Sequence, residues 1–235
     1  MTEGSNQVVV RVSDGTTMNA YVARPSGAGS GPGIMVLQDA FGVNPSLREI
    51  ADRYAGIGFV AIAPELFHRR VTGFTADYND LEAVMPHVRA LTVDELIADT
   101  RACFDWLTTE GGAKRNQIAS VGFCMGGRAT FIANSALPLA AGISYYGGGI
   151  APALLDRAGQ LHGRHLFFWG GQDKGISPEQ QHAVADAVRA AGKRFVSVEF
   201  SHANHGFFTA HRHDPDAARE SWAIGTAFLE DALRG

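Results

Sequence analysis

The segment Gly122-Phe123-Cys124-Met125-Gly126 carries the residue best suited to covalent chemistry, a cysteine flanked by glycines. It follows an apolar run and precedes a helical pattern, which is the setting of a nucleophile elbow. In such an elbow a sharp strand-to-helix turn exposes the central side chain, and the start of the helix favours a thiolate. Cysteine is also among the residues most often buried, but the glycines favour Cys124 as an attacking thiol.

The other cysteine, Cys103, falls at helical spacing with apolar neighbours and is assigned to the core. Two cysteines are too few for a disulfide framework, which favours a reducing compartment and leaves one thiol free for chemistry.

An elbow predicts an acid and then a histidine further along the chain, each directly after its own strand. Asp173 follows the apolar run at 166–169 and fits the acid, whereas its competitor Asp156 falls in an expected helix. His205 follows the run at 195–200 and fits the base, with His202 as the second choice.

These side chains suit acyl transfer through a covalent intermediate. His205 would accept the thiol proton, and Asp173 would fix the imidazole tautomer and stabilise its charged form. The thiolate would attack an ester or lactone carbonyl and give a thioester, which water then hydrolyses. The backbone N–H groups of Met125 and Ala40 are the expected oxyanion donors.

Short apolar runs and amphipathic stretches would position these groups. Strands are expected at 8–12, 18–23, 34–37, 59–63, 118–122, 140–145, 166–169 and 195–200. Helices are expected at 45–57, 92–110, 126–136, 178–191 and 215–233. Most runs lack polar alternation, as in strands covered on both faces. The pattern predicts an α/β fold with a mostly parallel central sheet, helices on both faces and an antiparallel N-terminal hairpin.

The interval from Pro64 to about Thr92 has no clear strand, and it predicts either a lid or binding loop or an ordered connector. A length of 235 residues suits one domain over 1–235.

Composition limits the partners. The net charge of −4 and the lack of a long basic run argue against nucleic acid. No apolar run approaches the roughly 20 residues that span a bilayer, and the N-terminal residues lack the basic region of a secretory signal. We therefore expect a cytoplasmic protein that acts on a small molecule without a membrane or nucleic-acid partner. A monomer fits these observations.

The chain resembles the dienelactone hydrolase (carboxymethylenebutenolidase) family over nearly its whole length, apart from about 66–92. The matching segments, in family order, are Gln38–Asn44, Gly122–Gly127, Tyr145–Gly147, Gly170–Asp173 and His205–Phe207. The resemblance implies the α/β-hydrolase fold, a lactone or ester substrate, and no metal or other cofactor. It also implies a Cys124–His205–Asp173 triad and an oxyanion hole at Ala40 and Met125.

The sequence departs from the family pattern in places that bear on the substrate. The best-known members carry Glu where this chain has Asp39, a carboxylate thought to hold the thiol poised until substrate arrives; Asp39 is our candidate for that role. Those members also have an arginine shortly after the histidine that grips a substrate carboxylate, and the segment 206–209 lacks it. Arg69, Arg70 and Arg212 are the candidates to replace it.

Aromatic side chains are candidates for an apolar substrate pocket. They are Phe41, Phe74, Tyr78, Tyr145 and Phe207, of which the last two border the elbow or histidine segments.

Other functional classes remain open. A metal site is one, because possible ligands cluster locally: His202, His205, His211, His213, Asp214 and Asp216. Their spacing matches no helical or finger-like metal motif, which favours accidental clustering. Within the same fold, a general carboxylesterase or thioesterase is the alternative enzyme. A non-catalytic small-molecule binding protein that retains the hydrolase fold is the alternative without turnover.

Overall fold

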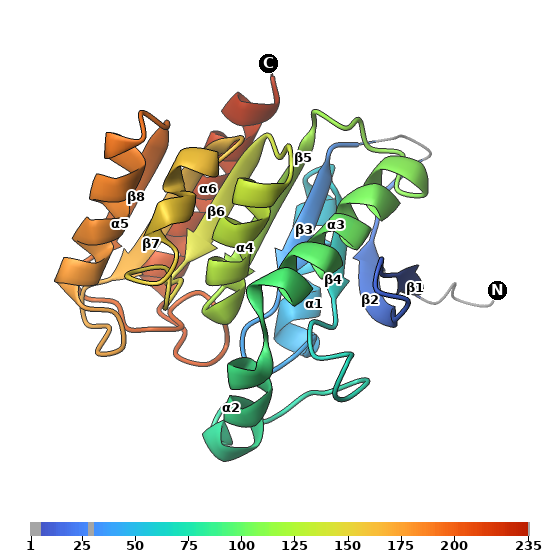
Figure 1. Ribbon diagram of the computed structural model, residues 1–235, viewed down its shortest axis with the longest axis horizontal. Coiled ribbons are helices and arrows are strands. Elements are labelled where there is room, and N and C mark those ends of the chain that lie inside the picture. Colours follow the sequence, from blue (N-terminus) through green and yellow to red (C-terminus); the bar gives the residue numbers. More distant parts are fainter. Residues whose placement is uncertain (1–5, 28–30, 235) are drawn as a thin grey trace. The chain divides into compact units, whose positions relative to one another are not determined.

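A computed structural model describes residues 6–27 and 31–234. The chain divides into two compact units, Met1–Ile118 and Ala119–Gly235, called unit 1 and unit 2 below. Each unit contributes its own run of strands and helices (Figure 1). The single domain expected over 1–235 stays a prediction.

Unit 1 contains the N-terminal hairpin and a parallel strand pair. Its strands lie side by side in the order β1-β2-β4-β3. The β1–β2 and β2–β4 pairs are antiparallel and the β3–β4 pair is parallel, so the predicted N-terminal hairpin is confirmed. Every residue of β3 and β4 is buried, as their unbroken apolar runs indicated. The bounds are β1 (Gln7–Arg11), β2 (Thr17–Ala23), β3 (Gly33–Leu37) and β4 (Val60–Pro64).

Three helices of unit 1 are α1 (Pro45–Gly56), α2 (Leu81–Ala90) and α3 (Val93–Thr109). The Asn44 side chain caps α1, and a reciprocal capping box of Thr92 and Glu95 starts α3. Helix α2 falls in the interval where the sequence indicated only a lid or connector. Its start is capped by Asp80, but Pro86 lies inside it and removes a backbone donor, which masks the helical pattern.

Unit 2 is a parallel sheet with helices on both faces. Its strands are β5 (Ile118–Phe123), β6 (Ala141–Tyr145), β7 (Arg164–Gly170) and β8 (Phe195–Phe200), in that spatial order and all parallel. Its helices are α4 (Met125–Ala136), α5 (Pro178–Ala190), α6 (Pro215–Leu233) and the 3₁₀ helix η1 (Leu155–Gln160).

Alternation along β6 assigns the two faces of this sheet. Ser144 bonds to the backbone of α4, whereas Ile143 and Tyr145 lie against Gly225 of α6. Successive side chains of a strand point to opposite faces, so α4 and α6 cover opposite sides, as Figure 1 shows. The carboxyl ends of β5, β7 and β8 then lead into the predicted elbow, acid and histidine segments.

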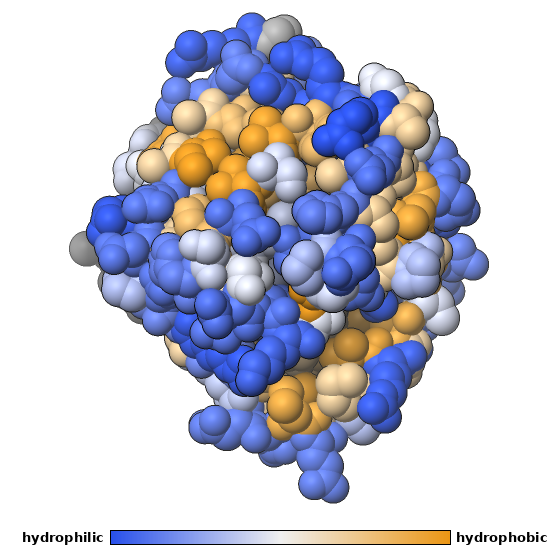
Figure 2. All heavy atoms as spheres, turned by 90° about the vertical axis from the view of Figure 1, so that its left-hand side faces the viewer, coloured by the Kyte–Doolittle hydropathy of each residue, from blue (hydrophilic) through white to orange (hydrophobic). Residues whose placement is uncertain are grey.

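The edge strand β8 differs from the buried strands beside it. Val196 is exposed on this strand, and the polar residues Ser197 and Glu199 are exposed as well. Figure 2 shows the face of the molecule on the side of α5 and β8, where hydrophilic residues dominate and apolar ones form scattered patches. Charged and polar side chains on an edge strand oppose pairing with another chain. Within the described part of the chain, no helix has the length and apolar character needed to cross a membrane.

Candidate active site

Cys124 lies in a strained turn between β5 and α4. Its φ of 55° and ψ of −117° are unusual for an L-residue. A Cβ at Gly122 would lie 2.0 Å from the carbonyl oxygen of Gly126, so only glycine fits there. The Cys124 N–H donates to the Tyr145 carbonyl at 3.0 Å, which fixes the turn to the end of β6. This is the strand–turn–helix geometry that the glycine pattern predicts.

The two cysteines have different environments. Cys124 is partly exposed, whereas Cys103 is buried in α3. Burial, and secondly the charge of Asp99, raises the pKa of the Cys103 thiol well above its usual value. A thiol held in its protonated form is a poor nucleophile, and this agrees with the assignment of Cys103 to the core.

The predicted acid and histidine are hydrogen bonded to each other. Nδ1 of His205, in the turn after β8, lies 2.7 Å from Oδ2 of Asp173, in the turn after β7. The other carboxylate oxygen of Asp173 accepts the Gly175 N–H at 2.8 Å. Only 1% of the Asp173 side chain is exposed, so the carboxylate is held in one orientation. Gly206 follows with a φ of 82°, a backbone conformation that favours glycine.

The electrostatics of His205 favour its charged form. Burial lowers the pKa of the imidazole, but the hydrogen bonds to Asp173 and to Cys124, together with their negative charges, raise it to about 10. The arrangement places a protonated imidazole between the Cys124 thiol and the Asp173 carboxylate.

Tyr146 is part of this surrounding and was missed from the sequence. Its ring centroid lies 4.9 Å from that of His205, and its φ of 38° is a second unusual backbone angle among non-glycine residues. The side chain is fully buried. The Tyr-Tyr-Gly motif marked this position only as a family match, since the turn that brings the ring to His205 has no local signature.

Two predicted pocket residues are fully buried among aromatic rings. Tyr145 and Phe207 are both 0% exposed. Tyr145 packs against Phe123 and Phe168 at ring distances of 4.9 and 4.6 Å, and Phe207 packs edge-on to Tyr146 at 5.2 Å. Neither presents surface to solvent, and their assignment as pocket walls stays a prediction. Proximity in sequence to the elbow and the histidine does not set the direction of a side chain.

The predicted oxyanion turn lies in unit 1 and is internally braced. Oδ1 of Asp39 accepts the Phe41 N–H at 2.9 Å, and both Asp39 and Ala40 are buried. Gly42 has a φ of 82° and bridges to Thr75. A Cβ at Gly42 would lie 2.0 Å from the Phe74 carbonyl oxygen, so the interval between β4 and α3 packs closely on this turn.

The same interval supplies the aromatic contact of Phe41. The rings of Phe41 and Tyr78 meet edge to face at 4.7 Å, and the Tyr78 hydroxyl accepts from Asn44 at 3.1 Å. Phe41 is 4% exposed and forms a cluster with Ala40 and Val84. Phe74 packs against this cluster as well, so the predicted aromatics of unit 1 gather beside the turn that carries Ala40.

The candidate substrate cations in unit 1 are ion-paired. Arg69 contacts Asp14 and the fully buried Asp99 at 2.7 and 2.8 Å. Arg70 contacts Glu95 at 3.0 Å. Arg212, in unit 2, is exposed. These carboxylates already neutralise the charge of both guanidinium groups and occupy several of their N–H donors, which argues against Arg69 and Arg70 as substrate ligands.

The alternative acid Asp156 and the alternative base His202 take no part in the Asp173–His205 hydrogen bond. Asp156 is exposed in η1. His202 has a side chain 55% exposed, with Asp214 at 3.8 Å as its charged neighbour. Among the described residues, no three His, Cys, Asp or Glu side chains come together as a possible metal site.

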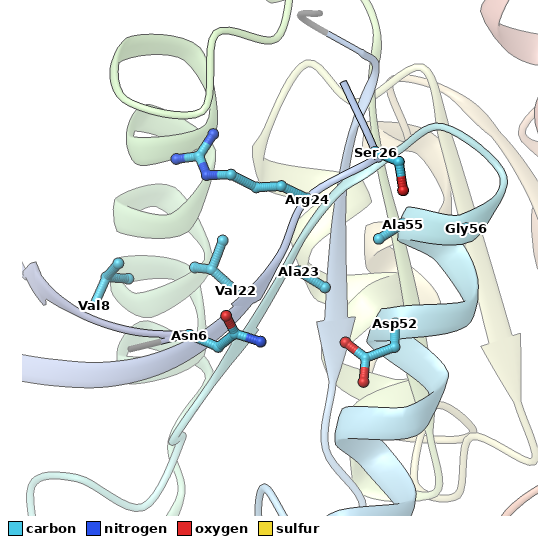
Figure 3. A pocket seen from close by; sticks show the side chains of 9 residues that line it. All are labelled: Asn6, Val8, Val22, Ala23, Arg24, Ser26, Asp52, Ala55 and Gly56. Carbon is cyan, nitrogen blue, oxygen red and sulfur yellow. The ribbon is translucent and has the colours of Figure 1, made fainter. Parts of the chain in front are cut away.

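A hollow of about 530 Å³ lies in unit 1, between β2 and α1 (Figure 3). Its lining includes Asn6, Arg24 and Asp52, and the Tyr21 hydroxyl donates to Asp52 at 2.8 Å. Its lining also includes Ser26 and apolar side chains, and it contains none of the predicted nucleophile, acid, base or oxyanion residues.

Comparisons with known proteins identify a family and similar structures. The model of the dienelactone hydrolase family matches residues 18–233. A putative carboxymethylenebutenolidase of Salmonella typhimurium is 32% identical over 222 residues, covering 89% of this chain and 81% of its own. The carboxymethylenebutenolidase of Pseudomonas sp. strain P51 is 27% identical, covering 93% and 91%.

Among solved structures, a putative dienelactone hydrolase from Klebsiella pneumoniae aligns with a TM-score of 0.85. It is 27% identical and the alignment covers 95% of this chain and 98% of that one. The predicted α/β-hydrolase fold is thereby confirmed. With the family model matching most of its length, the chain belongs to the dienelactone hydrolase family, a family of carboxylic-ester hydrolases.

Proposed function

We propose that this chain hydrolyses a lactone or carboxylic ester through a thioester on Cys124, with His205 as the proton carrier and Asp173 as its orienting acid. The observation that carries the proposal is the linked set of contacts in unit 2. Asp173 is 2.7 Å from one side of the imidazole, and the thiol of Cys124 is hydrogen bonded to His205. A nucleophile, a base and an orienting carboxylate in that order constitute the triad arrangement.

The steps follow from the charges. The thiolate attacks the carbonyl carbon, forming a C–S bond and an oxyanion. Collapse breaks the C–O bond, and the leaving alkoxide takes the proton from the His205 imidazolium. In a lactone that alcohol stays attached to the acyl group. The neutral imidazole then removes a proton from water, whose oxygen attacks the thioester, and departure of the thiolate restores the starting pair.

Oxyanion stabilisation would come from backbone donors. The N–H of Met125 begins α4, where the helix dipole favours negative charge. Ala40, on the braced turn of unit 1, is the proposed second donor, and Asp39 beside it is the proposed modulator of the thiol. The side-chain oxygen of Asp39 already holds the Phe41 N–H. That hydrogen bond supports a structural role for Asp39 in the turn. A second role for Asp39 in modulating the thiol must leave this hydrogen bond in place.

The substrate class follows from the paired arginines. Because Arg69 and Arg70 already pair with Asp99, Asp14 and Glu95, and Arg212 is exposed to solvent, we expect no strong preference for a carboxylate-bearing lactone. This favours neutral esters and lactones, as in a general carboxylesterase. Phe41 and Tyr78 are proposed as apolar substrate-pocket residues.

Hydrolysis by the purified chain tests the proposal. We would compare cis- and trans-dienelactone with neutral aryl esters, for the wild type and for Cys124→Ala. Loss of the nucleophile should lower kcat by at least roughly 10³-fold. Cys103→Ala is the matched control, because it removes a thiol that lies in the core, and its kcat should stay near that of the wild type.

Intact-mass spectrometry during turnover separates an enzyme from a binding protein. A transient acyl adduct on Cys124 that disappears as substrate is consumed would support the thioester. Turnover in Cys124→Ala at the wild-type rate, or tight binding of esters without adduct or product, would overturn the proposal. A clear preference for dienelactone over neutral esters would contradict only the substrate class.

A further inference from the structure

His165 is a buried histidine that the proposed chemistry does not use. It lies near the start of β7, beneath α4, and is 0% exposed. Its ring lies over Gly142, its partner in the β6–β7 pairing, where an added Cβ would come within 2.8 Å of two ring atoms. Gly142 therefore makes the space that the imidazole occupies.

The hydrogen bonds around His165 have one possible direction. Oδ1 of Asn134 accepts the Gly163 N–H at 2.9 Å, so its amide nitrogen is the donor group. That nitrogen donates to the Gly163 carbonyl and to Nδ1 of His165, each at 3.0 Å. Nδ1 is thus an acceptor, which places the ring proton on Nε2. In a doubly protonated ring, Nδ1–H and the Asn134 amide N–H would be two donors facing each other. The network therefore requires a neutral His165.

The chain of bonds ends on the nucleophile helix. Nε2–H of His165 donates to the Ser144 hydroxyl at 2.9 Å, and that hydroxyl donates to the Gly127 carbonyl at 2.6 Å. Because the histidine occupies one acceptor position of the serine oxygen, it leaves the hydroxyl proton to point at Gly127. The path from Asn134 through His165 and Ser144 to Gly127 is called the His165 relay below.

The relay reaches the first turn of α4 where that turn is already close to β6. The Cys124 N–H bonds to the Tyr145 carbonyl, and a Cβ at Gly127 would lie 2.7 Å from the same oxygen. Two attachments from consecutive residues of β6, the Tyr145 carbonyl and the Ser144 hydroxyl, therefore fix both ends of the Cys124–Gly127 turn. That turn carries the thiol and the Met125 N–H.

We propose that His165 is a positioning residue, which acts through Ser144 to hold the Cys124–Gly127 turn in the geometry needed for attack and oxyanion binding. The inference rests on the proposed function, since it assigns the same thiol and donor. The ring has no exposed surface and its two nitrogens are occupied by Asn134 and Ser144, so it exchanges no proton with a substrate. Misplacement of reacting groups by as little as an ångström lowers rates by orders of magnitude.

Ser144→Ala removes the last link while leaving the ring in place. We expect kcat to fall on the order of 10-fold with KM little changed. The pH profile of Cys124 alkylation by iodoacetamide should move to higher pH, because the displaced thiolate interacts less favourably with the positive end of the α4 dipole. The alkylation profile is measured without a substrate.

Ser120→Ala is the matched control. Ser120 is equally buried, on β5, and its hydroxyl bonds to Thr130 at 3.0 Å, further along α4. Its loss should lower stability by a similar amount while kcat and the alkylation profile stay near wild type. A purely structural role for the relay predicts equal effects in the two variants, and that result would overturn the inference.

A second variant covers the case in which Ser144→Ala fails to fold. His165→Phe keeps an aromatic ring beside Phe131 and Phe167 but removes the donor to Ser144, so kcat and the alkylation profile should shift in the same direction. An unchanged kcat and profile in folded His165→Phe would overturn the relay. Failure of the proposed function would instead show as wild-type turnover in Cys124→Ala. The alkylation profiles of Ser144→Ala, Ser120→Ala and His165→Phe could still be compared, because these variants keep Cys124.

Discussion

Unit 2 holds two buried or partly buried histidines that differ in charge. His205 lies at the carboxyl-terminal end of the sheet, and His165 lies in its interior beneath α4. His205 faces the Asp173 carboxylate and the Cys124 thiol, which outweigh burial and raise its pKa to about 10. His165 has only the neutral partners Asn134 and Ser144, so burial acts unopposed and lowers its pKa to about 3. Partner charge, more than depth, decides whether a buried imidazole carries a proton.

Because of this difference in charge, His205 and His165 support the proposed reaction in different ways. A charged imidazole can exchange protons with reacting groups, whereas a neutral and fully bonded one can only hold neighbouring groups in place. His165 lies in β7 and His205 in the turn after β8, and both are connected to the turn that carries Cys124. The comparison therefore predicts a much larger loss of kcat on substitution at His205 than at His165.

The largest expected effect is at His205. His205→Ala removes the proton carrier and should lower kcat by roughly 10²–10⁴-fold, as measured with an aryl ester at saturating concentration. The fold should survive, since the side chain lies at the end of the sheet and is 26% exposed. Near wild-type turnover in a folded His205→Ala protein would contradict the assignment of the base.

The sequence predicted the strands and helices around both histidines, but not the contacts of His165. Apolar runs located every strand of unit 2 to within about two residues, because strands buried on both faces, such as β5, β6 and β7, have a strong hydrophobic signal. The elbow glycines and the order of acid and histidine after successive strands then placed the candidate triad. Such signals are local, and each can be recognised one segment at a time.

The His165 relay depends on pairing between segments. Its ring fits only because Gly142 lies opposite in the β6–β7 register, and its tautomer follows from the orientation of Asn134. Register and amide orientation leave no mark on single segments. The direction of the Tyr145 side chain has a related origin, since strand alternation directs it toward α6 rather than toward the turn. Helix α2 was missed because Pro86 interrupts its pattern.

An intermediate effect is expected on the acid stability of the fold. An imidazole in the unfolded chain binds a proton below about pH 6.5, whereas native His165 stays neutral down to about 3. Between these values the unfolded state binds more protons, so the native state loses stability as pH falls, by up to about 1.4 kcal/mol per pH unit. His165→Phe cannot bind that proton, and its stability should depend less on pH in this window.

Urea unfolding of the wild type and His165→Phe at pH 7, 5 and 4 measures this dependence. The free-energy difference between the two proteins should shrink as the pH is lowered, because only the wild type loses the contribution of a neutral buried histidine. Other titrating groups, His205 included, are present in both proteins and cancel in the comparison. A difference that stays constant from pH 7 to pH 4 would show that native His165 titrates like an exposed histidine.

The smallest effect is expected at His202, which shares a turn with His205 but not its surroundings. Its side chain is 55% exposed, and Asp214 at 3.8 Å is too distant for a strong hydrogen bond. An exposed ion pair contributes at most about 1 kcal/mol, so His202→Ala should change kcat less than twofold under the assay used for His205→Ala. A larger loss in His202→Ala than in His205→Ala would transfer the role of base to His202. It would also require the 2.7 Å Asp173–His205 contact to be structural, since a carboxylate that orients the wrong imidazole cannot assist proton transfer.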